Sequence, residues 1–181
     1  MDTIGFLELS SIAGGIEAAD YMLKAAQVKL IFSRASCPGK YYILISGTVS
    51  GVESAVRQGV MIAKDFLISS LVLPRLHPQV IKAVNMSSMP DRIAAVGVLE
   101  FYSVTNALLA ADTAVKAANV DLVDVRLGTG IGGKSFIVLT GDTASVTSAV
   151  DSAAESQRDS GMLVNKIVIP NPDKELIASL L

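Results

Sequence analysis

The sequence is poor in the residues that build metal and disulfide sites, with one cysteine, Cys37, and one histidine, His77, among 181 residues. A lone cysteine cannot form a disulfide within the chain, and one thiol and one imidazole cannot build a metal site from one chain's soft ligands. Any such metal would have to be shared by several chains. No Ser, Cys or acidic motif accompanies His77, so we interpret it as a solvated side chain and expect no enzymatic activity.

Clusters of positive charge and long apolar runs are also missing. Lys and Arg number 15 against 17 Asp and Glu, a net charge of −2, so we do not expect nucleic acid as a partner. Although 51% of the residues are apolar, no uninterrupted run reaches the ~20 residues that span a bilayer, so no membrane segment is expected. Residues 1–4 lack the basic region and apolar core of a signal peptide, which predicts a cytosolic protein.

What the sequence does contain is an internal repeat. Identical residues recur 92 positions later, and the pairs include Gly5/Gly97, Leu7/Leu99, Glu8/Glu100, Ser11/Ser103, Asp20/Asp112, Lys24/Lys116 and Arg34/Arg126. The offset becomes 94 at Gly39/Gly133 and Lys40/Lys134, and 96 at Val72/Val168 and Pro74/Pro170. The chain is therefore a duplicated scaffold, and two residues were inserted between Arg126 and Gly133.

Each half follows the order strand, helix, strand, strand, helix, strand, as judged from apolar periodicity and turn residues. In the first half the strands are expected at 4–9, 28–32, 41–45 and 71–73, and the packed helix faces at Ile16, Ala19, Leu23 and Ala26, then at Val52, Val56, Gly59 and Ala63. This order predicts an α+β chain of two tandem ferredoxin-like (split βαβ) domains, residues 1–88 and 89–181. A short helix is expected over 78–84, before a small, polar linker at 86–90.

Two unequal turns distinguish the halves. The first, residues 34–40, reads Arg-Ala-Ser-Cys-Pro-Gly-Lys, and the second contains Gly128, Gly130, Gly132 and Gly133. Residues 128–135 match the P-loop pattern, but a P-loop needs a helix after its glycines, and an apolar strand follows here. Nucleotide binding is therefore not expected. Cys37 is either a small incidental residue or an exposed thiol with a function.

The repeated segments resemble bacterial microcompartment shell domains. The similarity is carried by residues 4–8 (Ile-Gly-Phe-Leu-Glu) with 96–100, and by 18–26 with 110–118 (Ala-Ala-Asp followed by Lys-Ala-Ala), and it covers almost the whole chain. The turn sequence Cys-Pro-Gly-Lys is similar to that of a tandem-domain type found in propanediol utilisation. The resemblance implies unpermuted domains in a structural shell protein of a cytoplasmic bacterial organelle, in which three chains form a homotrimer that imitates a hexamer.

The resemblance also assigns residues to places in that trimer. It implies a central pore lined by Ser36, Cys37, Pro38 and Gly39 from one half and by Gly130, Ile131, Gly132 and Gly133 from the other. It implies contacts between neighbouring shell proteins through Lys24, Lys116 and Arg75, whereas Asn171 stands at the second position equivalent to Arg75. Lys24 and Lys116 have a simpler explanation, since a cation near a helix end is favoured by the helix dipole.

In the cysteine-bearing type, the resemblance implies that the pore cysteine ligates an iron–sulfur cluster. Three Cys37 thiolates on a threefold axis would supply three of the four ligands of a 4Fe–4S cluster. Electron transfer or cluster delivery across the shell would follow, with an encapsulated redox enzyme as a further candidate partner. Three alternatives remain at this point: a metabolite pore without a cluster, a zinc site made of three thiolates and water, and a ferredoxin-like sensor of small molecules.

Overall fold

The computed structural model describes residues 3–88, 90 and 92–180. Two compact units divide the chain, Met1–Leu76 and His77–Leu181. This division differs from the domain boundary expected between residues 88 and 89. The reason is a short helix, α3 (Pro78–Val84), which packs on the second unit. Met89, in the expected linker, and residues 1–2, where a signal peptide was judged absent, lie outside the described residues.

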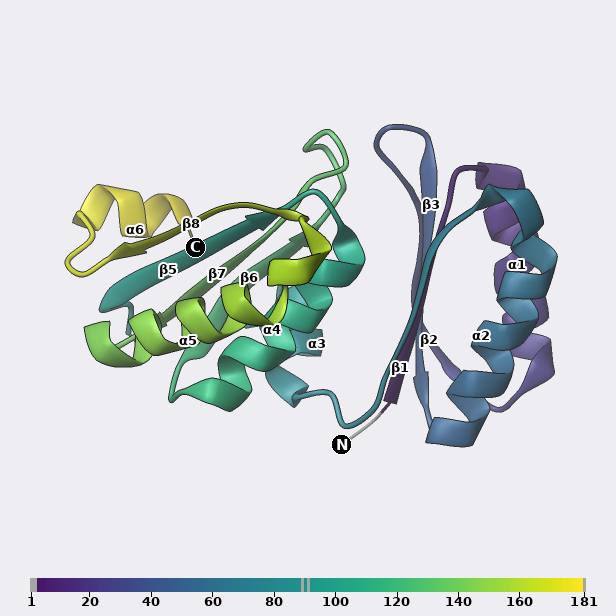
Figure 1. Cartoon of the computed structure of the whole chain (residues 1–181), viewed down its shortest axis with the longest axis horizontal. Coiled ribbons are helices and arrows are strands. Elements are labelled where there is room, and N and C mark those ends of the chain that lie inside the picture. Colours follow the sequence, from purple (N-terminus) through teal and green to yellow (C-terminus); the bar gives the residue numbers. More distant parts are fainter. Residues whose placement is uncertain (1–2, 89, 91, 181) are drawn as a thin grey trace. The chain divides into compact units, whose positions relative to one another are not determined.

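The first unit is a four-stranded antiparallel sheet with helices on one face (Figure 1). Its strands are β1 (Thr3–Leu9), β2 (Lys29–Ser36), β3 (Lys40–Gly47) and β4 (Leu67–Leu73), in the spatial order β2-β3-β1-β4. The helices α1 (Ile12–Ala25) and α2 (Val49–Ala63) pack against each other, and a 3₁₀ turn, η1 (Lys64–Phe66), leads into β4.

The second unit repeats this architecture. Its elements are β5 (Ala95–Phe101), α4 (Val104–Ala117), β6 (Asp121–Leu127), β7 (Ser135–Gly141), α5 (Thr143–Ser156), η2 (Arg158–Ser160) and β8 (Leu163–Ile169), in the strand order β6-β7-β5-β8. The helix α3 precedes β5, and a further helix, α6 (Lys174–Leu180), follows β8. The predicted α+β class with two tandem split βαβ domains is confirmed. The helix α6 was not anticipated.

Strand register reproduces the repeat in detail. Gly5 is paired with Ile45 and Val72 in the first sheet, and Gly97 with Leu139 and Val168 in the second. The β2–β3 ladder shifts register between Leu30 and Phe32, and the β6–β7 ladder shifts between Leu122 and Asp124. Because both partners and irregularities match, the insertions that change the repeat offset left the sheets intact.

Recurring small and polar residues explain how each helix begins and packs. Ser11 and Ser103 cap α1 and α4, and each side-chain oxygen accepts a hydrogen bond from the backbone N–H three residues later. Gly5 faces α2, where an added Cβ would lie 2.6 Å from Val56 Cγ2, and a Cβ added at Gly97 would lie 2.7 Å from Val150 Cγ2. These glycines recur because the second helix of each unit sits directly on the central strand.

The cores lie between sheet and helices, but one expected helix face is not covered within the chain. Leu7, Met22, Ile43, Val52 and Ala55 belong to the buried cluster of the first unit. Ile16 and Leu23, expected on the packed face of α1, are instead exposed. On α4, Leu108, the counterpart of Ile16, is fully buried, and Val115, the counterpart of Leu23, is half-buried. Apolar periodicity correctly identifies the helix but does not specify which chain covers its face.

Within the described ranges, no helix is both long enough and apolar enough to cross a membrane.

Candidate functional site in the hairpin turns

The first hairpin turn presents a thiol at its tip. Only Cys37, Pro38 and Gly39 connect β2 to β3, so the turn is tighter than the expected 34–40. The Cys37–Pro38 peptide bond is cis, and Gly39 has φ 77°, a left-handed conformation that glycine adopts without a steric cost. Cys37 is exposed. Its side chain is therefore accessible at the tip of the hairpin.

The second hairpin turn is longer and carries no thiol. Four glycines with positive φ, Gly128, Gly130, Gly132 and Gly133, shape it between β6 and β7. Gly128 N donates to Lys134 O at 3.0 Å, and Lys134 N donates to Ile131 O at 3.2 Å. The strand β7 follows directly, as the sequence predicts, so these glycines serve a turn rather than a helix N-terminus that could hold phosphate.

Each turn is anchored by an ion pair to the first strand of its own sheet. Lys40 Nζ donates to Glu8 Oε1 at 2.6 Å, and Lys134 Nζ donates to Glu100 Oε1 at 2.9 Å. The Glu8 side chain is 4% exposed, while that of Glu100 is 35% exposed. The repeat in the sequence contains both the glutamates and the lysines but does not by itself pair them. The signal was present, because both partners recur in the repeat.

The electrostatics of the anchors differ between the turns. The hydrogen bond to Glu100 raises the pKa of Lys134 above its ordinary value. Beneath the first turn, burial raises the pKa of the Tyr42 phenol. The Tyr42 ring lies 5.7 Å from the ring of Phe6, centroid to centroid, on the sheet next to Glu8. The strands next to the first turn thus carry an aromatic pair, Phe6 and Tyr42, and the nearly buried carboxylate of Glu8.

The residues expected to line a pore differ in exposure. Cys37, Pro38, Gly39, Gly130 and Gly132 are exposed, Ile131 is half-buried, and Ser36 and Gly133 are buried at the bases of the turns. An added Cβ would meet no atom within 4 Å at Gly39, Gly130 or Gly132. The tips therefore have open space around them. Their arrangement about a shared axis stays a prediction, since it needs several chains.

Metal ligands do not gather within one chain. Among residues 3–88, 90 and 92–180, no three His, Cys, Asp or Glu side chains are close enough to hold a metal ion together. His77 caps α3 by accepting a hydrogen bond at Nδ1 from Gln79 N at 3.4 Å. A metal bound through Cys37 would therefore take further ligands from other copies.

The residues expected at contacts between shell proteins lie away from the turns. Lys24 and Lys116 occupy the last turns of α1 and α4, and each pairs with the aspartate one turn earlier, at 2.5 Å. The hydrogen bond that Lys24 Nζ donates to Asp20 raises the pKa of Lys24. Arg75 is exposed after β4 with φ 55°. These placements fit both a helix-end role and an edge role for the lysines.

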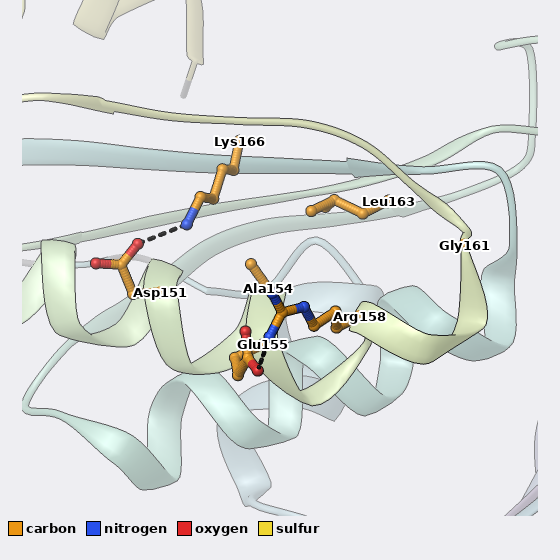
Figure 2. Close-up of a pocket in the computed structure, with 7 residues that line it drawn as sticks. All are labelled: Asp151, Ala154, Glu155, Arg158, Gly161, Leu163 and Lys166. Carbon is orange, nitrogen blue, oxygen red and sulfur yellow. Dashed lines mark hydrogen bonds and ion pairs between the residues drawn. The ribbon is translucent and has the colours of Figure 1, made fainter.

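A surface hollow of about 500 Å³ lies on the second unit between α5, η2 and β8 (Figure 2). Its charged residues are already paired, with Lys166 at 2.6 Å from Asp151 and Arg158 at 3.0 Å from Glu155. Each charged residue that lines the hollow therefore has a partner of opposite sign.

Comparison with known proteins places these turns in a family. The BMC domain matches residues 3–76 and 95–172. The chain is 46% identical to the bacterial microcompartment shell protein PduT of Citrobacter freundii, over 96% of this chain and 94% of that one. It is 29% identical to the carboxysome assembly protein CcmO of Synechococcus elongatus, over 98% of this chain and 68% of that one.

A solved structure agrees over the full length. The crystal structure of a microcompartment protein from Desulfitobacterium hafniense superposes with a TM-score of 0.94 and 48% identity, covering 98% of this chain and 99% of that one. The resemblance inferred from the sequence is thereby confirmed. The chain belongs to the BMC-domain family, as a tandem-domain structural protein of a bacterial microcompartment shell.

Proposed function

We propose that three copies of this shell protein form a ring of six BMC domains whose central pore holds an iron–sulfur cluster on Cys37. A chain with two repeated domains fills six equivalent places with three copies, and closed cyclic symmetry is the commonest form of such assemblies. The observation that carries the cluster proposal is the exposed Cys37 thiol at the tip of the first turn. A threefold axis turns one thiol per chain into three converging ligands.

The turn residues fit such a group. Thiolate is the preferred ligand of iron–sulfur clusters, and Cys37 is the chain's only cysteine. Gly39, two residues on, has open space where a side chain would stand, so neighbouring tips can approach closely. The Glu8–Lys40 pair fixes the base of the hairpin and thereby the direction of the tip. Three thiolates leave one iron of a 4Fe–4S cluster open to water or a small molecule.

Bound in this place, such a cluster would supply one-electron transfer across the shell, or a source of clusters for enclosed proteins. An encapsulated redox enzyme is the corresponding partner. Other shell proteins would adjoin the ring at its outer edges through Lys24, Lys116 and Arg75. Asn171 replaces Arg75 in the second unit, so alternate edges of the ring would differ in charge.

The test is anaerobic purification followed by light scattering, absorption spectroscopy and analysis of iron, zinc and sulfide. We expect a mass about three times 18.9 kDa, a brown protein, and iron and sulfide in equal amounts. Zinc without sulfide would replace the cluster by a thiolate zinc site. A colourless trimer after iron and sulfide reconstitution would favour a metabolite pore, and a stable monomer would remove the ring itself.

The matched variants are Cys37→Ser and Ile131→Ser, one in each turn. Serine keeps its proton at neutral pH and cannot replace thiolate as a soft ligand, so Cys37→Ser should lose colour, iron and sulfide together. Since Cys37 is exposed, unfolding free energy should change by no more than about 0.5 kcal/mol. Ile131→Ser should keep the cluster. Full iron and sulfide in Cys37→Ser would place the cluster elsewhere, and loss of the trimer would make Cys37 a packing residue.

A further inference from the structure

The helices α3 and α6 are equivalent elements of the repeat. The helix α3 begins at Pro78 after β4 ends at Leu73, and α6 begins at Lys174 after β8 ends at Ile169, so the two connections have equal length. Both helices lie just beyond the segments that match the BMC domain. Each is also capped from the same position, because Asp173 Oδ1 accepts from Glu175 N at 2.8 Å as His77 accepts from Gln79 N.

The helix α3 shows what such a helix contacts. It leaves the last strand of the first sheet and packs on β6 and α4 of the second unit. Gln79 binds β6 through both ends of its side-chain amide. Its Nε2 donates to Asp121 Oδ1 at 3.0 Å, and its Oε1 accepts from Leu122 N at 3.0 Å. The His77 backbone N–H donates to Asp112 Oδ1 on α4 at 2.8 Å. Val80 is fully buried in this position.

The helix α6 leaves the corresponding side chains uncovered. Leu176, which takes the place of Val80, is 40% exposed, against 0% for Val80. The carboxylate of Glu175, which takes the place of the Gln79 amide, has no hydrogen bond or ion pair to any residue that the structure describes. The Leu176 side chain and the Glu175 carboxylate are thus available to contact a partner outside the single chain.

The matching surface on the first unit is also uncovered. The residues equivalent to Asp121 and Leu122 are Lys29 and Leu30, on β2. Leu30 is 38% exposed, whereas Leu122 is fully buried. On α1, which corresponds to the helix α4 that α3 contacts, Ile16 and Leu23 are exposed as well. A residue-for-residue counterpart of the surface that receives α3 thus lies open, and it is apolar.

The charges on the two open surfaces are complementary. The hydrogen bond between Gln79 and Asp121 joins two positions that hold Glu175 and Lys29 in the other half of the repeat. The Gln79 amide thus corresponds to the Glu175 carboxylate, and the Asp121 carboxylate corresponds to the Lys29 ammonium. A carboxylate and an ammonium attract each other in the geometry that the amide and carboxylate adopt. A change at one position alone would have left an unmatched group, but both positions differ, and the two replacements carry opposite charges.

We infer that α6 of one copy docks on β2 and α1 of the first unit of a second copy, with Glu175 against Lys29 and Leu176 beside Leu30. The contact is heterologous, because a C-terminal helix meets a different surface of the next chain, and such contacts form a closed ring when the rotation from one copy to the next closes. The inference rests on the proposed ring for the number of copies, three. It assigns the contact that joins chain to chain, which the cluster proposal does not address.

Charge reversal tests the contact in the full chain. Glu175→Lys and Lys29→Glu should each raise the concentration at which the trimer half-dissociates by about tenfold or more, because like charges then oppose each other at every junction. The double variant should return it close to the wild-type value. Glu53→Lys, an exposed charge reversal on α2, is the control and should leave the trimer unchanged. Single reversals without effect, or a double variant no better than either single one, would overturn the contact.

Disulfide trapping separates this inference from the proposed ring. Glu175→Cys and Lys29→Cys are combined in the Cys37→Ser background, whose trimer is first verified by light scattering. Oxidation should give linked dimers and then linked trimers on a non-reducing gel, and neither single-cysteine variant should give trimers. Monomers with an internal disulfide, or no linkage in an intact trimer, would overturn the contact and leave the ring. A wild-type monomer would overturn both.

Discussion

Glu8 Oε1 and Lys40 Nζ lie 2.6 Å apart and join the adjacent strands β1 and β3 at the base of the cysteine turn. The carboxylate of Glu8 is nearly buried and also accepts a hydrogen bond from Ser69 Oγ at 3.1 Å. Because Lys40 begins β3 directly after Gly39, this pair controls where the hairpin tip points. The counterpart in the second unit, Glu100 with Lys134, is more open to solvent.

Replacing these two glutamates should have unequal effects. Glu8→Gln keeps the shape but gives the half-buried Lys40 a neutral acceptor, and we expect a loss of about 1–2 kcal/mol in unfolding free energy. Glu100→Gln should cost clearly less, because water screens a pair that is this exposed. Urea unfolding followed by circular dichroism measures both. Equal losses would show that the burial of Glu8 does not set its contribution.

The helix caps offer a test by pH. Asp142 caps α5 through Ser145, and those hydrogen bonds lower its pKa below the ordinary 3.8. A carboxylate whose pKa is lower in the folded than in the unfolded state stabilises the fold at pH values above its unfolded pKa. This contribution is lost as the pH falls through the folded pKa. Asp142→Ala should therefore destabilise at pH 7 and progressively less below about pH 4. Thermal melts across that range measure the difference.

Thr48 provides the matched control, since it caps α2 in the first unit with a hydroxyl that does not titrate. Thr48→Ala should cost about 1 kcal/mol at every pH where the protein folds. If the Asp142→Ala loss were as independent of pH as this one, the charge of Asp142 would not contribute to the cap.

Two glycines should fail for different reasons when changed to alanine. Gly39→Ala forces a side chain into φ 77° with nothing nearby, and we expect a cost of about 1 kcal/mol from backbone strain alone. Gly97→Ala instead drives a methyl group against Val150 and should cost about 1–3 kcal/mol by overpacking. Unfolding in urea gives both values.

Second-site changes distinguish the two mechanisms. Val150→Ala should recover part of the Gly97→Ala loss, because it removes the methyl groups that the new Cβ meets. Gly39→Asn should cost less than Gly39→Ala, since asparagine tolerates positive φ better. Rescue of Gly39→Ala by Val150→Ala would contradict this account.

Lys24→Ala and Lys116→Ala should both weaken the assembly of trimers into sheets, if these side chains act between shell proteins at their rims. Their effects on the folded chain should differ. Asp20, the partner of Lys24, is exposed, whereas Asp112 is nearly buried and also receives the His77 N–H. Lys116→Ala should therefore lower the melting temperature by about 2–4 °C, and Lys24→Ala should leave it unchanged.

Electron microscopy of the overexpressed variants measures sheet formation, with Lys166→Ala on β8 as a control that removes another exposed, paired lysine. Undiminished sheets in the Lys24→Ala, Lys116→Ala double variant would return both lysines to a helix-end role.

Much of the fold could be predicted because each sequence pattern occurs twice, once in each half of the repeat. The helix over 78–84, the strand ends before Pro74 and Pro170, and the order of elements all agree with the structure. The β2 strand was expected to end earlier, because Arg34 and Ser36 are polar although they pair with β3. Local pattern does not show which polar residues a neighbouring strand will hold.

The contacts that orient the turns were harder to predict. Glu8 and Lys40 stand far apart in sequence and meet only because β1 pairs antiparallel with β3. Ile16 and Leu23 were expected to be covered, and within one chain they are exposed. Periodicity reports that a face is apolar, but the identity of its cover depends on tertiary and quaternary contacts that a single sequence does not record.

The two sheets also show where this chain has already tolerated extra length. The second half is longer in only two connections, the turn around Thr129 and the loop around Gly161, and every strand register survived both additions. At Gly161, φ is 65° and nothing lies within 4 Å of a Cβ position. The two copies of the repeat thus show which connections accept extra residues. The Gly161 loop is where an epitope tag or a short cargo-binding peptide could be inserted without disturbing either hairpin.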